Sequence, residues 1–456
     1  APAHVQGGFA VALPQPDGQV WMAADRMGQQ TLCYAQHHGP LRYAERADAL
    51  APGGMDAIDP QALYDYLYFH CIPSPRTVYR GVQRLEPGHS AHFDGRTLRI
   101  KAFWTPRFEE PVSADFGHCR DEFRRLLREA VARELEPGGK AACFLSGGTD
   151  SSTVAGMIGQ VTGRPAATYS IGFEAQGYDE MAFARIAARH FGTEHHEYYV
   201  TPADLVAGIG TVARHYDQPF GNSSALPAYC CARFARDDGV RRLLAGDGGD
   251  ELFGGNARYA RQRVFGWYRR VPGPLRTALT EPLLLGTPLG RLPLLRKGAR
   301  YVVQARVPMP ARLQQHNLLL RLDPREVLTP GFLAQVDEGA PLAHQERVWG
   351  LAQCRGELNR TLAYDWRYTL ADSDLPKVRG TAELAGLSVA FPMLDDALLA
   401  FSQRLPDDYK LRGLKLRWFF KEALRGFLPD EILHKKKQGF GPVSYTHLRA
   451  HETKAN

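Results

Sequence analysis

The residues best suited to chemistry lie in the segment 144–152, which reads FLSGGTDSS. Its adjacent glycines, Gly147 and Gly148, let the backbone curl tightly and expose its N–H groups. Ser146 and Ser151 add hydroxyl donors, and a helix that begins after the loop points its positive N-terminus at the same place. This pattern indicates an anion site suited to phosphate or pyrophosphate. The alternative is a tight turn closed by an Asx cap.

Two aspartates extend this interpretation. Asp150 lies inside the loop, where a carboxylate beside phosphates requires a bridging hard cation such as Mg²⁺. A second glycine-rich segment, AGDGGDE at 245–251, also follows a short apolar run and precedes a helix. Because the carboxyl ends of parallel strands meet at one edge of a sheet, we expect Asp150 and Asp250 to hold one Mg²⁺ together. The alternative for the second segment is an acidic helix N-terminus favoured by the helix dipole.

A third segment, KKKQGF at 435–440, places Lys437 near a glycine. Such a lysine can reach a phosphate site as a mobile point charge, and the alternative is a solvated lysine run. The chain has no G-x-x-x-x-G-K-[ST] segment, which argues against ordinary transfer of a γ-phosphate. His195 and His196 have no third metal ligand nearby in the sequence, so no metal site is expected there.

These segments need a framework that brings them together. From residue 140 onward, apolar runs alternate with segments of helical spacing. The expected strands are 141–145, 167–173, 196–200 and 241–245, and the expected helices are 151–159, 178–191, 202–215 and 226–236. This alternation predicts a parallel sheet with helices on both faces. Beyond residue 255 the chain reads as mostly helical.

Residues 8–105 have a different pattern. Short runs predict strands at 7–13 and 19–25 with a turn between them, and a helix is expected near 60–70. Another helix is expected at 119–134. The fold class is therefore α/β, with a β-rich part before the parallel sheet.

Composition restricts the function classes. Hydrophobic residues make up 44% of the 456 residues and charged residues 23%, and the formal net charge is +7. No apolar run reaches the roughly 20 residues that cross a bilayer, so no membrane partner is expected. The densest basic stretch, 261–312, is also rich in Leu and Pro, which favours a helical connector over a nucleic-acid surface. The seven cysteines show no C-x-x-C spacing, which favours reduced thiols in a cytoplasmic protein.

The two ends do not fit the rest of the chain. Residue 1 is Ala, and the tail 443–456, VSYTHLRAHETKAN, has no apolar period. We expect a chain that is cut at the front and carries a non-native or disordered tail at the back.

Several blocks, taken in order, resemble the glutamine-hydrolysing asparagine synthetase family. They are SGGTDSS, YSIGF at 169–173, YDE at 178–180, DQPFGNSSALPAY at 217–229, GDGGDELFGG at 246–255, FPMLDD at 391–396 and KQGF at 437–440. Upstream, ADRMGQQTLCY at 24–34 and RTVYRGVQRLEPGH at 76–89 resemble the end of that family's class II glutamine amidotransferase domain. The resemblance implies a remnant of an α+β glutaminase domain at 1–110. It also implies an ATP-pyrophosphatase (HUP-like) domain with a helical C-terminal portion at 117–442.

The resemblance also implies a role for each site residue. The ATP-binding residues are Phe144, Ser146, Gly147, Gly148, Asp150, Ser151, Ile171, Ala245 and Gly246. Asp150 and Asp250 hold Mg²⁺. Asp247 is tied to formation of an acyl-adenylate, and Lys437 stabilises the charged transition state.

The activity that the resemblance implies is ATP-dependent amide synthesis. A carboxylate, with aspartate as the first expectation, is adenylated, and ammonia from glutamine converts it to an amide with release of AMP and pyrophosphate. The expected partners are thus small molecules rather than nucleic acid, with a homodimer as the assembly to test.

Two departures from the family pattern leave alternatives open. The family's catalytic N-terminal Cys would lie before residue 1, and Cys33 has no free α-amino group to act as its base. The family's L-E-x-R-x-P pattern reads LSVAFP here, with Ser388 and Ala390 in place of Glu and Arg. An amidotransferase that acts on another carboxylate is one alternative, and a tRNA-modifying ATP pyrophosphatase is the other.

Overall fold

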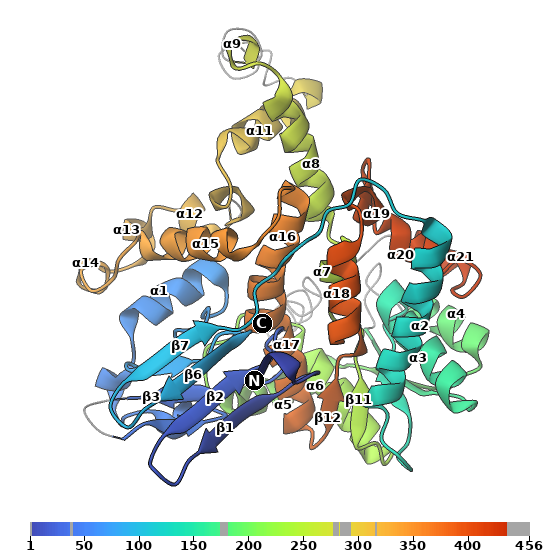
Figure 1. Cartoon of the computed structure of the whole chain (residues 1–456), viewed down its shortest axis with the longest axis horizontal. Coiled ribbons are helices and arrows are strands. Elements are labelled where there is room, and N and C mark those ends of the chain that lie inside the picture. The colour runs from blue at the N-terminus through green and yellow to red at the C-terminus, as the bar shows by residue number, and fades with distance from the viewer. Residues whose placement is uncertain are drawn as a thin grey trace, which may run out of the picture.

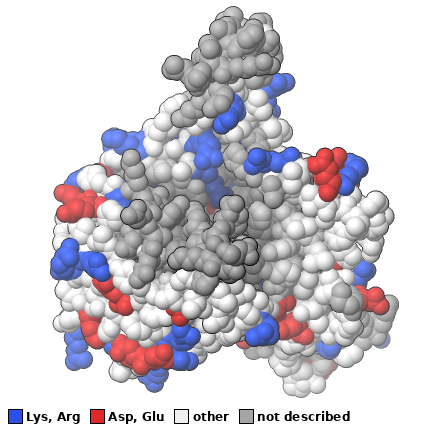
Figure 2. All heavy atoms as spheres, turned by 180° about the vertical axis from the view of Figure 1, so that it is seen from behind, with Lys and Arg blue, Asp and Glu red and all other residues white. Residues whose placement is uncertain are grey.

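The computed structural model describes residues 2–36, 40–173, 181–276, 282, 293–314 and 317–435. Figure 1 shows the N-terminal strands beside a second, parallel sheet, with the helices between residues 257 and 351, coloured from yellow-green to orange, above the N-terminal strands. Among the described residues, no helix combines the length and apolar character needed to cross a membrane. On the face seen in Figure 2, acidic and basic side chains are interspersed, so the described part of that face has no broad field of one sign.

The N-terminal part consists of two antiparallel sheets and one helix. One sheet has the order β1-β2-β6-β7, and the other has the order β4-β3-β5. Their elements are β1 (Ala10–Pro14), β2 (Val20–Ala24), β3 (Cys33–Ala35), β4 (Arg42–Ala44), α1 (Pro60–Phe69), β5 (Val82–Arg84), β6 (His89–Phe93) and β7 (Leu98–Ala102). The strands and helix expected near residues 7–25 and 60–70 are confirmed.

The second part is built on a parallel five-stranded sheet of order β10-β9-β8-β11-β12. Its strands are β8 (Ala142–Phe144), β9 (Ala167–Gly172), β10 (Glu194–Tyr199), β11 (Arg242–Leu244) and β12 (Ser388–Ala390). The chain adds strands on one side of β8 and then on the other, so the order reverses between β8 and β11. In open α/β sheets, ligands bind outside the carboxyl ends of the strands at such a switch point.

Helices connect and cover these strands as the alternation predicted. They are α2 (Phe116–Glu134), α3 (Thr149–Thr162), α4 (Met181–Phe191), α5 (Pro202–His215) and α6 (Ala225–Asp237). Helix α5 begins with a capping box in which the Thr201 side chain and Asp204 each bond the other's backbone N–H. Helix α2 buries Phe123 and Leu127 against the sheet helices, which anchors the core behind the switch point. The part of the expected helix at 178–180 lies outside the described residues.

The C-terminal portion is mostly helical, as expected, and it also contains three short strands. Its elements are α7 (Gly249–Phe253), α8 (Ala257–Arg270), α9 (Gly273–Leu275), α11 (Pro293–Arg306), η6 (Ala311–Gln314), α12 (Leu318–Arg321), α13 (Pro324–Val327), α14 (Pro330–Leu333), α15 (Ala340–Leu351), α16 (Glu357–Asp365), the π-helix η7 (Trp366–Asp374), α17 (Leu375–Leu384), η8 (Pro392–Leu394), α18 (Asp396–Arg404), α19 (Asp407–Lys410), β13 (Leu411–Arg412), β14 (Lys415–Leu416), α20 (Trp418–Ala423) and α21 (Asp430–His434). The sequence did not predict β12, which completes the parallel sheet beside β11. Three residues are too few to show a strand period.

A buried group of ions, here called the seam cluster, joins the N-terminal part to η7. It comprises Arg84, Glu86, Arg367 and Asp372. Arg84 donates to Asp372 at 2.8 Å, and Arg367 donates to Asp372 at 3.0 Å and to Glu86 at 2.6 Å. The three buried members are 8% exposed or less. The seam cluster therefore ties the first part of the chain to the helix that precedes α17.

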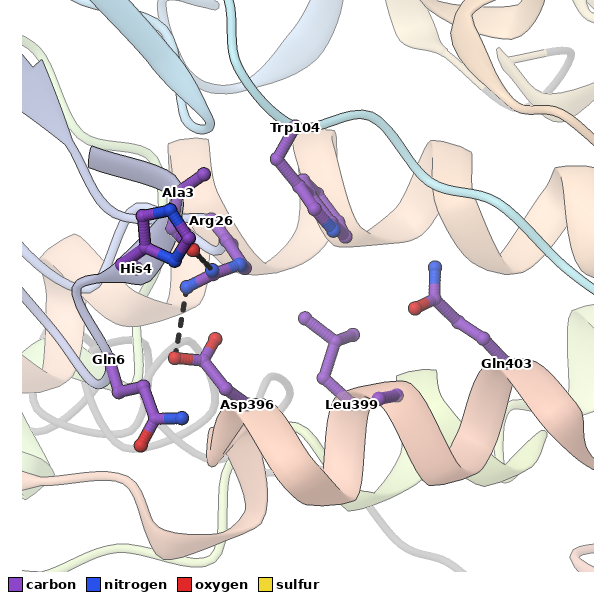
Figure 3. A pocket seen from close by; sticks show the side chains of 9 residues that line it. Ala3, His4, Gln6, Arg26, Trp104, Asp396, Leu399 and Gln403 are labelled. Carbon is purple, nitrogen blue, oxygen red and sulfur yellow. Dashed lines mark hydrogen bonds and ion pairs between the residues drawn. The ribbon is translucent and has the colours of Figure 1, made fainter. Parts of the chain in front are cut away.

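A small cavity lies elsewhere along the same seam, between the N-terminal segment and α18 (Figure 3). It has a volume of about 300 Å³, and its polar contacts include an ion pair of 3.0 Å between Arg26 and Asp396 and a hydrogen bond of 2.6 Å from Arg26 to the carbonyl oxygen of Ala3. None of the glycine-rich loop residues lines it. The cavity is thus a feature of the seam and not of the switch point.

Candidate active site

The first glycine-rich loop follows β8 and curls around its own hydroxyl groups. Ser146 donates its backbone N–H to the Oγ of Ser151 at 3.2 Å, and the two serine hydroxyls lie 3.0 Å apart. Gly147 has a φ of +67°, and a Cβ there would overlap the backbone of Phe183 and Ala184 on α4. Only glycine fits this position. The loop therefore has the tight curl and hydroxyl arrangement that the sequence predicted.

The second glycine-rich loop follows β11 and touches the first. A Cβ on Gly246 would come within 2.8 Å of the Ser151 backbone nitrogen, so the two loops pack backbone against backbone. Gly248 has a φ of +101°, a conformation that a residue with a side chain rarely adopts. The predicted convergence of the two loops at one edge of the sheet is present in the structure.

The side chains of Asp150 and Asp250 meet at one guanidinium. Nη1 of Arg417 donates to Oδ2 of Asp150 at 2.7 Å and to Oδ1 of Asp250 at 2.7 Å. Its Nη2 also donates to Asp150. We call these three residues the loop cluster. Both carboxylates pack so closely on glycines that a Cβ at Gly249 would overlap Asp150 and one at Gly255 would overlap Asp250.

Arg417 itself was not predicted from the sequence. It is 4% exposed, has a φ of +54°, and lies over the Phe420 ring at 3.9 Å. Burial lowers the pKa of Arg417, but Asp150 and Asp250 outweigh burial and raise that pKa above its ordinary value. The segment LRWFF offers no periodic or glycine signal, and only the need of two adjacent acids for a cation could have indicated it.

The donor set at this point suits a hard cation. The two carboxylates supply oxygen atoms only, which is the ligand type that Mg²⁺ prefers. They already share one cationic partner, so they can converge on a single positive centre. Asp150 and Asp250 could therefore hold Mg²⁺ next to a bound phosphate.

Asp247 lies in a second electrostatic group at the same edge of the sheet. Burial raises the pKa of Asp247 to about 6, while Lys377 acts to lower it. Lys377, on α17, donates to Asp374 at 2.8 Å. Burial lowers the pKa of Lys377, yet Asp374 and Asp247 together raise it above its ordinary value. Lys377 and Asp374 are thus neighbours of the site that the sequence did not reveal.

The lysine segment begins at the first loop. Lys435 donates to the carbonyl oxygens of Ser146 and Gly147, both at 3.3 Å, and its ammonium lies 4.8 Å from the centre of the Phe183 ring. Lys437 lies outside the described residues, as do the tail 443–456 and the YDE segment. Lys435 thus lies at the first loop, and it precedes Lys437 by two residues in the sequence.

The residues expected to line the nucleotide lie on neighbouring strand ends. Phe144 ends β8, Ile171 lies in the adjacent β9, and both side chains are half-buried. Ala245 follows β11, and its N–H donates to the carbonyl oxygen of Ala390 at 2.9 Å. These positions flank the two loops. Their contact with a nucleotide stays a prediction.

A different acid–histidine group lies at the amino ends of the strands. Possible ligand atoms of Glu194, His196 and Asp238 lie within 4.8 Å of one another, so His196 has the companions that the sequence did not reveal. The ammonium of Lys140 lies 2.5 Å from Asp238 and 3.3 Å from Glu194. A lysine thus offsets part of the negative charge of this group.

Cys33 does not have the environment of a nucleophile. Its side chain is buried, with 1% exposed. Burial raises the pKa of its thiol to about 12, so the reactive thiolate is scarce near neutral pH.

Comparison with known protein families identifies the family to which the chain belongs. The asparagine synthase model matches residues 122–455. The chain belongs to the asparagine synthase family. A model of the glutamine amidotransferase domain matches residues 2–104. Members of the asparagine synthase family are ligases that couple ATP to amide formation, and the chain is an enzyme of this class.

Relatives cover nearly the whole chain. A Mycobacterium tuberculosis (strain ATCC 25618 / H37Rv) protein is 30% identical over 98% of this chain and 69% of its own length. Glutamine-hydrolysing asparagine synthetase 1 of Bacillus subtilis is 26% identical over 99% of this chain and 70% of its own length. Amidase chyE of Penicillium rubens is 29% identical over 56% of this chain and 40% of its own length. NMN synthetase from Francisella tularensis, a solved structure, has a TM-score of 0.24 at 14% identity and covers 56% of this chain and 94% of its own.

The two departures from the asparagine synthase pattern lie on β12. Ser388 is exposed at the start of the strand, and Ala390 is 3% exposed beside Ala245. Ala390 thus places a methyl group next to the second loop, where the family pattern has an arginine.

Proposed function

We propose that this asparagine synthase family member activates a carboxylic acid as its acyl-adenylate and converts the adenylate to an amide with ammonia. Aspartate is the first candidate substrate and asparagine its product. The observation that carries the proposal is the meeting of Asp150 and Asp250 from two touching glycine-rich loops at the switch point of the sheet. Such a site combines anion-binding N–H groups with a place for a cation.

In the first step, a carboxylate oxygen of the acid attacks the α-phosphorus of ATP, and pyrophosphate leaves with the electrons of the α–β bond. The N–H groups and hydroxyls of the Ser146 loop bind the pyrophosphate as charge develops on it. Mg²⁺ held by Asp150 and Asp250 would offset part of that charge. We assign to Lys437, two residues beyond Lys435 in the sequence, a further positive charge that offsets the charge on the leaving pyrophosphate.

In the second step, ammonia attacks the carbonyl carbon of the adenylate. The bond between that carbon and the oxygen shared with phosphorus breaks, AMP leaves with the bond's electrons, and the attacking nitrogen loses a proton to give the amide. Asp247 belongs to the second loop, and its neighbour Lys377 lies on α17, next to the place where we expect the acyl group to react. We assign to Asp247 the formation of the adenylate, with Lys377 keeping its carboxylate ionised. Glutamine is the proposed source of ammonia in the complete protein. A cytoplasmic location and a homodimeric assembly remain predictions.

A second candidate is a different carboxylic acid. Two observations favour it, namely the loss of charge at Ser388 and Ala390 and a relative whose name is amidase rather than asparagine synthetase. An arginine at position 390 could pair with an acidic substrate, and a methyl group cannot. The reaction type stays the same for both candidates.

The test supplies ammonium chloride, ATP and Mg²⁺ with aspartate, glutamate or acids that have an apolar body, and measures pyrophosphate and AMP. We expect AMP and pyrophosphate to form in equal amounts, and to form only when one particular acid of the panel is present. Release of ADP and phosphate with every acid would refute the adenylation, and turnover with an apolar acid alone would replace aspartate as the substrate.

A further inference from the structure

Arg417 fills the place between the two carboxylates to which the proposed function assigns the metal. We infer that Arg417 is a positioning residue that holds Asp150 and Asp250 together before the nucleotide binds, and that it competes with the divalent cation for them. The inference rests on the proposed function, because it concerns the same two carboxylates. It adds that the divalent cation binds together with the nucleotide and only weakly without it.

The geometry makes the two cations exclusive. One nitrogen, Nη1 of Arg417, lies 2.7 Å from an oxygen of Asp150 and 2.7 Å from an oxygen of Asp250. A Mg²⁺ ion lies about 2.1 Å from each oxygen that it binds. An ion bound to the same two oxygens therefore overlaps the position of Nη1. Arg417 must give up at least one carboxylate when the ion binds.

Several contacts fix Arg417 in this place. The Arg417 N–H donates to the carbonyl oxygen of Lys410 at 2.9 Å, and the guanidinium lies over the ring of Phe420. A Cβ at Gly255 would come within 2.5 Å of the Arg417 Cδ, so the absence of a side chain there makes room for the arginine. Arg417 adopts a left-handed backbone conformation, which costs energy for any residue other than glycine. This arginine is built into the site.

The hydrogen bonding of the guanidinium is incomplete. Its Nε is buried and has no hydrogen-bond partner in the described part of the structure. Its Nη1 also donates to the hydroxyl of Thr149 at 2.9 Å, which is the first residue of α3. The arginine is thus bound through its Nη atoms alone, and release of one carboxylate leaves it the other carboxylate and Thr149.

Electrostatics then links the metal to the nucleotide. Arg417 is already paired with both carboxylates, so a free divalent ion must displace a strong partner. Like charges in contact within a protein repel strongly, so the guanidinium and the ion cannot share both carboxylates. Phosphates of ATP beside the Ser146 loop add negative charge, which attracts the divalent ion and gives it further oxygen ligands. The two ligands should therefore bind cooperatively.

The test is a titration with Mn²⁺ as the probe, followed by electron paramagnetic resonance of the free ion, without nucleotide and with ATP. Because ATP itself binds Mn²⁺, the binding measured in a protein-free solution of the same ATP concentration is subtracted. The wild-type protein should bind Mn²⁺ at least about 10-fold more tightly with ATP than without it. Arg417→Met should bind Mn²⁺ without ATP at least about 10-fold more tightly than the wild type, because the competitor is gone. Arg417→Lys keeps the charge and should stay close to the wild type. Arg133→Met removes an exposed arginine paired with Asp395 and should change nothing.

The outcomes separate the inference from the proposed function. Unchanged Mn²⁺ affinity in a folded Arg417→Met variant, or equal affinity with and without ATP in the wild type, overturns the inference. The wild-type comparison needs no variant, so it decides even if Arg417→Met does not fold. If the wild type binds no Mn²⁺ with ATP, and Asp150→Asn is no different, then the two-carboxylate site itself is wrong and the proposed function fails.

Discussion

The molecule contains two buried groups of arginines and carboxylates, and they differ in how completely their members are paired. In the seam cluster, Asp372 accepts hydrogen bonds from Arg84, Arg367 and the Ser74 hydroxyl at 2.7 to 3.0 Å. Arg367 also donates to Glu86. Burial raises the pKa of Glu86, but Arg367 and Arg347 outweigh burial and hold that pKa below its ordinary value. The seam cluster is a network in which each charge has several partners.

The loop cluster contrasts with the seam cluster in backbone and in position. Arg417 has a left-handed φ, its Nε has no hydrogen-bond partner among the described residues, and its two carboxylates press on glycines at the carboxyl edge of the sheet. Buried polar networks with every member paired rigidify a structure. Strained and incompletely paired groups concentrate at functional sites. The difference indicates that the seam cluster holds two parts of the chain together, whereas the loop cluster is a site where a partner can be exchanged.

The largest expected effect comes from the loop carboxylates. Asp150→Asn and Asp250→Asn should each abolish Mg²⁺-dependent release of pyrophosphate, because each removes a charged ligand of the proposed cation. The measurement is pyrophosphate release with ammonium as the nitrogen source. Turnover at the wild-type rate in either variant would contradict the assignment of these residues.

The next effect concerns stability at the seam. Arg367→Met leaves Asp372 and Glu86 with fewer partners, and removal of one member of a buried ion pair costs about 3–5 kcal/mol. Denaturant unfolding measures this loss, which no divalent cation should restore. The matched control is Arg425→Met, whose exposed pair with Glu422 contributes about 0–1 kcal/mol. If Mn²⁺ restored the unfolding free energy of the Arg367→Met variant, the two clusters would no longer differ in the way proposed.

Lys437 should act on adenylation and not on ATP binding. A charge that meets its partner only as the α–β bond opens lowers kcat and leaves binding nearly unchanged. We expect Lys437→Ala to bind ATP normally by calorimetry and to release pyrophosphate at least ~100-fold more slowly, the size of effect seen for one preorganised donor. Loss of ATP affinity with normal turnover at saturation would make Lys437 a binding residue.

How far the sequence predicts this molecule depends on whether a feature is local. The strand–glycine–helix order around Ser146 and Gly246 is local, so the loops, the parallel sheet and the meeting of the two loops were predicted correctly. The Mg²⁺ that Asp150 and Asp250 were expected to hold stays a prediction. Arg417 reaches Asp150 across 267 residues of sequence, and nothing in its neighbourhood marks it. Lys377 likewise reaches Asp247 only through the packing of α17.

Short elements and contacts between distant segments are the other features that the sequence did not predict. Strand β12 has three residues, and its pairing with β11 is what makes it a strand. The seam cluster depends on two segments whose patterns are separately ordinary, 84–86 and 367–372. In both cases tertiary contacts decide the structure, and sequence periodicity does not record them.

A smaller effect is expected from pH, which changes the free energy of unfolding through His344. Burial lowers the pKa of His344 from 6.5 to about 4, so its ring is neutral in the folded protein. The unfolded chain takes up the proton first as pH falls below 6.5, and the contribution to stability is lost between pH 6.5 and about 4. The wild type should lose about 1 kcal/mol of unfolding free energy relative to His344→Gln between pH 7 and 5.5. Parallel pH profiles of the two proteins would contradict this.

The smallest effect is expected at Cys33. Its thiol is buried with a pKa raised to about 12, so Cys33→Ser should leave glutamine use and ammonium-dependent turnover unchanged. Glutamate release from glutamine, compared between the variant and the wild type, measures this. A loss of glutamate release in the variant would give Cys33 a role that its burial argues against.

The proposed function requires that the acid is activated at the α-phosphorus of ATP beside the loop cluster. This step can be followed with the substrate acid labelled with ¹⁸O in its carboxylate, together with ATP, Mg²⁺ and ammonium, and mass spectrometry of the products. An acyl-adenylate transfers one carboxylate oxygen to phosphorus, so we expect one ¹⁸O in AMP and none in pyrophosphate. Labelled inorganic phosphate formed together with ADP would show attack at the γ-phosphorus and would refute adenylation.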